Sequence, residues 1–77
     1  MSSIRKYSVT LKGHRTSISL EPLFWTLLNE IAQRDHKPLP SLISEIEEAM
    51  YRASQASNLS SQIRLYVVND FLKREKQ

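Results

Sequence analysis

The segment from His14 to Trp25 reads HRTSISLEPLFW, and it contains the change of pattern that decides the fold. Apolar and polar side chains alternate from Thr16 to Leu20, and this period of two indicates a half-buried β-strand. Glu21 and Pro22 then open a helix, because the N–H that proline lacks would have no partner in a first turn. The sequence therefore predicts a strand that leads directly into a helix.

Two more helices are expected after the first. Pro38 ends the first helix near His36, and the second helix starts around residues 38–41. Residues 54–57 are typical of a linker, and Asn58 is the expected N-cap of the third helix. Apolar residues at helical spacing form one stripe per helix: Phe24, Leu27, Leu28, Ile31 and Ala32; then Leu39, Leu42, Ile43, Ile46, Ala49, Met50 and Ala53; then Leu59, Ile63, Tyr66, Val67 and Phe71.

The third helix carries more apolar surface than an ordinary surface helix. A second line of Leu65, Val68 and Leu72 widens its apolar arc. We therefore expect part of this helix to meet a partner or to cover a dimer.

The segment before the strand leaves two alternatives open. Residues 7–12 also alternate between apolar and polar side chains. Gly13 at the first central position suits a type II′ turn with His14, which would give an intrachain hairpin. Otherwise this segment and the following strand form one long extended arm, whose second half is the real strand.

Size and composition exclude several classes of protein. The chain has 77 residues and no cysteine, which excludes disulfides and thiolate metal sites. Two histidines are too few for a closed zinc site, so we expect no metal and no cofactor. The apolar runs are too short to cross a membrane, so we expect a cytoplasmic protein without membrane contact. No glycine-rich phosphate loop or nucleophile elbow occurs, and we expect no enzymatic activity.

The charge is unevenly distributed along the chain. Lysine and arginine total 11 against 8 aspartate and glutamate residues. Residues 1–20 hold Arg5, Lys6, Lys12 and Arg15 and no acid, whereas residues 21–58 are net negative. This asymmetry indicates a polyanion at the N-terminus, either nucleic acid or an anionic surface, with ordinary solubility as the alternative explanation.

A core of this size barely offsets the loss of chain entropy, and a lone strand leaves its edge unpaired. Pairing of the strand with its copy across a two-fold axis is the simplest solution. It predicts a mainly α-helical, intertwined homodimer with a short antiparallel β ribbon lying on interlocked helices, plus a third C-terminal helix. The expected divisions are a basic arm or extra strand at 1–13, a core at 14–54, and a linker with the last helix at 55–77.

The segment from His14 to Glu21, followed by Phe24-Trp25, Leu28 and Ile31-Ala32, resembles the ribbon-helix-helix superfamily of MetJ/Arc-type regulators. It is most similar to a short bacterial branch with a late Asn-Leu-Ser-Ser helix, here residues 58–61, and the similarity covers roughly residues 14 to 70. The resemblance implies a sequence-specific transcription regulator that binds double-stranded DNA as a homodimer, with the paired strands in the major groove. The alternative is a protein-interaction or antitoxin-like dimer whose third helix docks a partner protein.

This resemblance assigns roles to individual residues. If Thr16, Ile18 and Leu20 face the helices, the opposite face presents the expected base contacts, which are Arg15, Ser17 and Ser19. In this family the N-terminus of the second helix clamps a phosphate, but Pro38 and Pro40 each lack the N–H that such a clamp uses. The expected phosphate contacts are Arg5, Lys6, Lys12, His14, Lys37, Leu39 and Ser41, and the expected dimer core is Ile18, Leu20, Phe24, Trp25, Leu28, Ile31, Leu42, Ile43 and Ile46.

Overall fold

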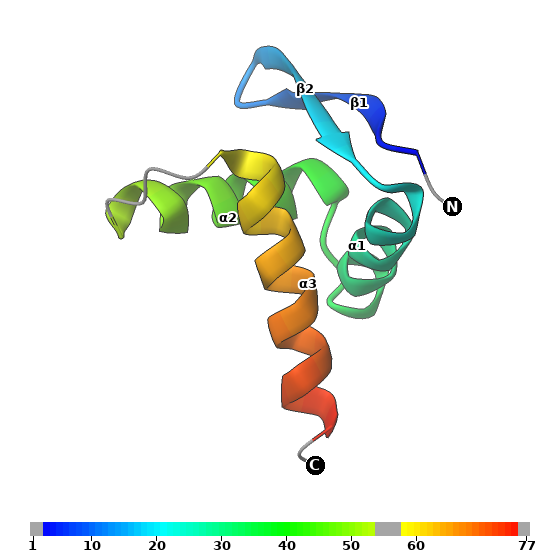
Figure 1. Ribbon diagram of the computed structural model, residues 1–77. Helices are drawn as coiled ribbons and strands as arrows, with labels where there is room; N and C mark the ends of the chain where they lie inside the picture. Colours follow the sequence, from blue (N-terminus) through cyan, green and yellow to red (C-terminus); the bar gives the residue numbers. More distant parts are fainter. Residues whose placement is uncertain (1–2, 54–57, 76–77) are drawn as a thin grey trace.

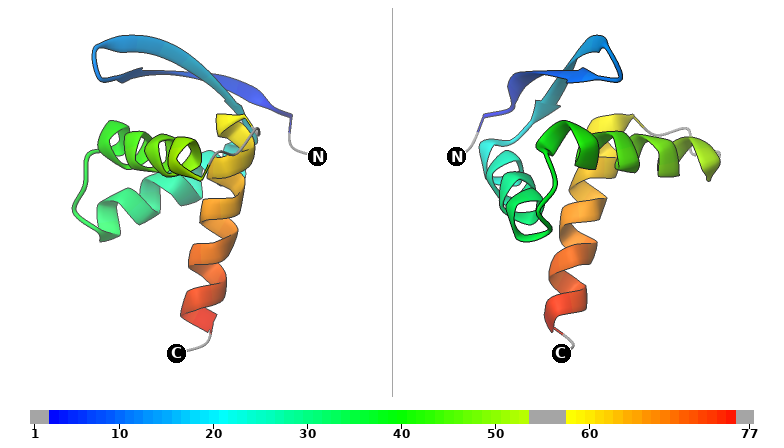
Figure 2. Two further views of the ribbon diagram at one scale, coloured as in Figure 1. Left: turned by 90° about the vertical axis from the view of Figure 1, so that its left-hand side faces the viewer. Right: turned by 180° about the vertical axis from the view of Figure 1, so that it is seen from behind.

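The computed structural model describes residues 3–53 and 58–75 and has two strands followed by three helices (Figure 1). The elements are β1 (Arg5–Leu11), β2 (His14–Leu20), α1 (Pro22–Arg34), α2 (Leu39–Arg52) and α3 (Leu59–Glu75). The two strands lie across one side of the helices, and the C-terminal end of α3 extends beyond the other elements (Figures 1 and 2). The predicted order of ribbon and helices is confirmed. The predicted linker at 54–57 lies outside the described residues.

The ribbon is formed within one chain. β1 and β2 pair antiparallel from Arg5 opposite Leu20 to Leu11 opposite His14, so the intrachain hairpin exists and the long extended arm is wrong. The turn consists of Lys12 and Gly13, with φ values of 52° and 84°. Two positive φ values define a type I′ turn, whose twist matches that of the flanking strands. The expected type II′ turn at Gly13 and His14 is therefore wrong by one residue.

The helix ends follow the predicted signals. Pro22 lies in the first turn of α1, and Pro38, with extended backbone, is the N-cap of α2. The side chain of Asn58 accepts a hydrogen bond of 2.9 Å from the backbone N–H of Ser61, so the predicted N-cap of α3 is confirmed. None of the helices in the described part of the chain is long and apolar enough to cross a membrane.

One chain closes a continuous core between the hairpin and the helices. The hairpin contributes Val9, Leu11, Ile18 and Leu20, and α3 contributes Ile63 and Val67. Of the side chains expected in a dimer core, Phe24 and Trp25 are half-buried, whereas the others are buried within the single chain: Ile18, Leu20, Leu28, Ile31, Leu42, Ile43 and Ile46. Their burial therefore does not depend on a second copy.

The second apolar line of α3 remains exposed. Leu65, Val68 and Leu72 are exposed, and Phe71 beside them is 59% exposed. The inner line, which includes Ile63 and Val67, packs on the core. The helix thus has one face in the core and a second apolar face in contact with solvent.

Candidate nucleic-acid interface

The outer face of the hairpin is polar, basic and free of acids. Val9, Leu11, Ile18 and Leu20 point into the core, and strand alternation sends their neighbours to the opposite face. The structure therefore places Arg15, Ser17 and Ser19 on the outer face, the orientation that the alternation predicts. β1 adds three side chains to this outer face, which are Lys6, Ser8 and Thr10.

The pairing of the strands arranges these side chains in three cross-strand pairs. Lys6 lies opposite Ser19, Ser8 opposite Ser17, and Thr10 opposite Arg15. Nη2 of Arg15 donates a long hydrogen bond of 3.4 Å to Oγ of Ser8. A bond of this length is weak, so the guanidinium keeps donors for a ligand. The outer face, defined here as these six side chains, offers two cations and four hydroxyl groups.

Sequence reasoning did not single out Ser8 and Thr10, although a signal for them was present. Residues 7–12 show the same alternation as residues 16–20. Once Val9 and Leu11 are assigned to the core, the intervening Ser8 and Thr10 must face outward. The sequence did not decide between a hairpin and an extended arm, so these two residues were not predicted to share a face with Arg15.

Two of the expected phosphate contacts are engaged by acids of α2. Lys12 in the turn pairs with Glu48, and Nζ of Lys37 lies 2.7 Å from Oε1 of Glu45. The hydrogen bond to Glu45 raises the pKa of Lys37, and the bond from Lys12 lowers the pKa of Glu48. All four side chains are substantially exposed, so these pairs contribute little stability. They nevertheless place negative charge beside both lysines.

The N-terminus of α2 offers few donors for a phosphate. Pro38 and Pro40 have no backbone N–H, and the N–H of Leu42 bonds to the carbonyl of Pro38. The shallow depression beside this helix end is lined by Lys12, Pro40, Ser41, Ser44, Glu45 and Glu48. Its two carboxylates oppose an anion. The geometry thus does not favour the phosphate clamp that the resemblance suggests at Leu39 and Ser41.

Lys6 and Arg15 are the cations of the outer face, whereas Arg5 and His14 are exposed at the two ends of the hairpin. Among the described residues, no acidic side chain lies within ion-pair distance of Lys6 or Arg15. Glu21, the acid nearest to β2 along the chain, is held by Nε of Arg64 at 2.8 Å. This hydrogen bond lowers the pKa of Glu21 and balances its charge. The outer face therefore keeps its positive charge.

Stacking of Tyr7 on Trp25 fixes the free end of β1 to α1. The ring centroids are 4.1 Å apart and the planes differ by 6°. Both rings are half-buried against the core. Trp25 thus belongs to the packing of the hairpin, and it is not a platform for nucleic-acid bases.

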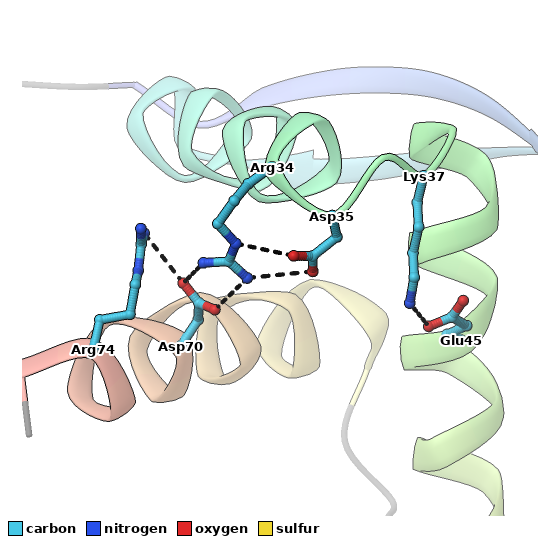
Figure 3. Close-up of polar contacts among 6 residues, drawn as sticks. All are labelled: Arg34, Asp35, Lys37, Glu45, Asp70 and Arg74. Atoms are coloured by element: carbon cyan, nitrogen blue, oxygen red, sulfur yellow. Dashed lines mark hydrogen bonds and ion pairs between the residues drawn. The ribbon is translucent and has the colours of Figure 1, made fainter. Parts of the chain in front are cut away.

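A further group of charges joins the helices at a distance from the hairpin (Figure 3). Arg34 of α1 donates to Asp35 and to Asp70 of α3, and Asp70 also accepts from Arg74. The shortest N–O distance from Arg34 to each of these two acids is 2.9 Å. The hydrogen bond from Arg34 lowers the pKa of Asp35. These contacts connect α3 to the end of α1 and leave the outer face of the hairpin unobstructed.

A β ribbon with a basic outer face, followed by packed helices, is the architecture of the β-ribbon class of DNA-binding proteins. The family model described as "Ribbon-helix-helix domain" matches residues 4–71, and the chain belongs to this family. The chain is also similar to a solved structure, that of an uncharacterized protein from Bordetella pertussis Tohama I, with 32% sequence identity and a TM-score of 0.79. That match covers 96% of this chain and 60% of the other. No curated protein matches the chain.

Proposed function

We propose that this chain is a sequence-specific transcription regulator that binds double-stranded DNA as a homodimer, through the outer face of its hairpin. The observation that carries the proposal is the basic, acid-free set of side chains on that face, with Arg15 among hydroxyl groups. Arginine binds guanine O6 and N7 with two parallel hydrogen bonds, and serine discriminates less because it both donates and accepts. Family membership supports this use of the ribbon.

The free edge of β2 supports a particular pairing in the proposed dimer. A two-residue turn makes Leu11 and His14 a hydrogen-bonded pair, and such pairs alternate along the hairpin. The backbone groups of Arg15, Ser17 and Ser19 therefore point away from β1, toward the free edge of β2. A second β2 pairs antiparallel at this edge. Full overlap of the two strands sets Ser17 opposite the partner's Ser17 and Arg15 opposite the partner's Ser19.

The test is binding of the purified chain to DNA fragments selected from its source genome, measured by fluorescence anisotropy at several salt concentrations. Affinity for a selected fragment should fall steeply with salt, because each neutralised phosphate releases counterions. Arg15→Ala should cost about 1–3 kcal/mol for each bidentate arginine–guanine pair that it removes, and it should reduce discrimination between selected and random DNA. The matched control is Arg74→Ala, which removes an arginine paired with Asp70 on α3. Equal affinities of wild type and Arg15→Ala for the selected DNA contradict base recognition by the ribbon.

A second candidate function is docking of a protein partner on α3, and the exposed apolar face of that helix favours it. Phe71, which is 59% exposed, is the residue to change. Phe71→Asp should abolish capture of a partner and leave the urea midpoint of the chain near that of wild type, because the side chain lies outside the core. Unfolding of the variant would instead assign this face to the fold.

A further inference from the structure

β1 is an integral strand of the fold. Val9 and Leu11 are buried in the core, and Tyr7 stacks on Trp25. Lys12 in the turn pairs with Glu48 of α2. Release of β1 from β2 would expose these apolar side chains and break the strand pairing, and this cost opposes opening of the hairpin when the protein binds a ligand.

A dimer joined at β2 consequently has four strands, in the order β1, β2, the partner's β2 and the partner's β1. Neighbouring strands lie about 4.8 Å apart, so the outer two are separated by about 14 Å. The major groove is about 12 Å wide, and this width admits the central pair of strands but not all four. The two β1 strands therefore lie over the sugar-phosphate backbones that border the groove.

The side chains of β1 suit that position. Lys6, Ser8 and Thr10 supply one cation and two hydroxyl groups, which are side chains that commonly contact phosphate oxygens. The alternation of hydrogen-bonded pairs also directs the backbone N–H groups of these three residues to the outer edge of β1. Side chain and backbone donors thus occur at the same three positions.

The N-terminus of α2 is poorly suited to bind phosphate. It has prolines at positions 38 and 40, and Glu45 and Glu48 line the depression beside it. Resting on the DNA-binding function proposed above, we infer that β1 is the phosphate-binding strand of this protein. Lys6, Ser8 and Thr10 bind the DNA backbone, while Arg15, Ser17 and Ser19 of β2 contact the bases.

The experiment compares Lys6→Gln and Thr10→Val with wild type on a selected DNA fragment and on random DNA. Each variant should bind both DNAs more weakly by the same factor, because phosphate contacts carry no base information. The slope of log K against log salt should fall by about 0.9 for each phosphate that Lys6 neutralises, or about 1.8 for the two copies of Lys6→Gln. Thr10→Val removes an uncharged contact, so it should weaken binding without changing this slope. The control is Lys73→Gln, which removes an exposed lysine near the end of α3. Thr10→Val keeps the shape and strand propensity of the side chain, so its weaker binding is not a folding defect.

The outcomes separate the two proposals. Loss of discrimination in Arg15→Ala, together with wild-type affinity in both β1 variants and a wild-type salt slope in Lys6→Gln, overturns the role of β1 and leaves the DNA-binding function intact. A change of sequence preference in either β1 variant also overturns the inference, because β1 would then contact bases. Absence of DNA binding by wild type at low salt overturns the proposed function itself.

Discussion

Replacement of Ile63 tests whether α3 belongs to the core of the single chain. Ile63 is 0% exposed, whereas Leu65 on the same helix is 54% exposed. Ile63→Ala removes three carbon atoms, which at about 0.8 kcal/mol per buried methylene gives about 2.4 kcal/mol. The cavity that remains raises the expected loss to about 3 kcal/mol, inside the usual range of about 2–5 kcal/mol. A chain of this length has a total free energy of unfolding of about 4–12 kcal/mol.

The assay is urea unfolding followed by the fluorescence of Trp25, the single tryptophan. With a denaturant slope of about 1.5 kcal/mol/M, the midpoint of Ile63→Ala should fall by about 2 M. The matched control is Leu65→Ala, which removes a similar volume from the exposed face and should lower the free energy of unfolding by less than about 1 kcal/mol. Equal midpoints for the two variants would refute the packing of α3 on the core. A loss in Leu65→Ala alone would show that a partner copy covers the outer face.

Three more predictions concern the turn, one acid and the dimer edge. Gly13→Ala should lower the free energy of unfolding by about 1–2 kcal/mol in urea titration, because φ of 84° is unfavourable for a residue with a Cβ although space is free around it. The hydrogen bond from Arg64 lowers the pKa of Glu21 below its ordinary 4.5, so the unfolded chain binds more protons in acid than the folded chain does. The free energy of unfolding should therefore decrease as the pH is lowered through 4.5 and beyond, and Glu21→Gln should make this decrease smaller in urea titrations at several pH values. Ser17→Cys should form an intermolecular disulfide on mild oxidation, whereas Thr10→Cys on the outer strand should not; the opposite pattern on a non-reducing gel contradicts pairing at β2.

The elements of this fold were predictable because their signals are local. A period of two over residues 16–20 and a helical period after Pro22 specify strand and helix without tertiary information. The choice between hairpin and arm was not predictable, because both produce the same alternation in residues 7–12. It depends on Lys12 adopting a positive φ, which lysine seldom does, and on the burial of Val9 and Leu11 in the core, which only the tertiary structure decides.

The candidate site was predictable in part for the same reason. The pleat alone assigns Arg15 to the outer face once Ile18 is placed in the core. The pairing of Lys37 with Glu45 and of Lys12 with Glu48 depends on tertiary placement, and sequence patterns do not report it. Both lysines were expected to contact phosphate, but each pairs with an acid of α2 that lies farther along the chain.

The packing of α3 on the core changes what a second copy of the chain contributes. A short chain without cysteine suggested that a partner is needed to complete the core, but Ile63 and Val67 of α3 complete it within one chain. In the proposed dimer the partner instead extends the ribbon along β2. One hairpin presents a single Arg15, and the two-fold axis adds the partner's Arg15 on the same face. Because affinity for a repeated half-site depends on both copies, loss of dimerisation should weaken DNA binding far more than it weakens the fold.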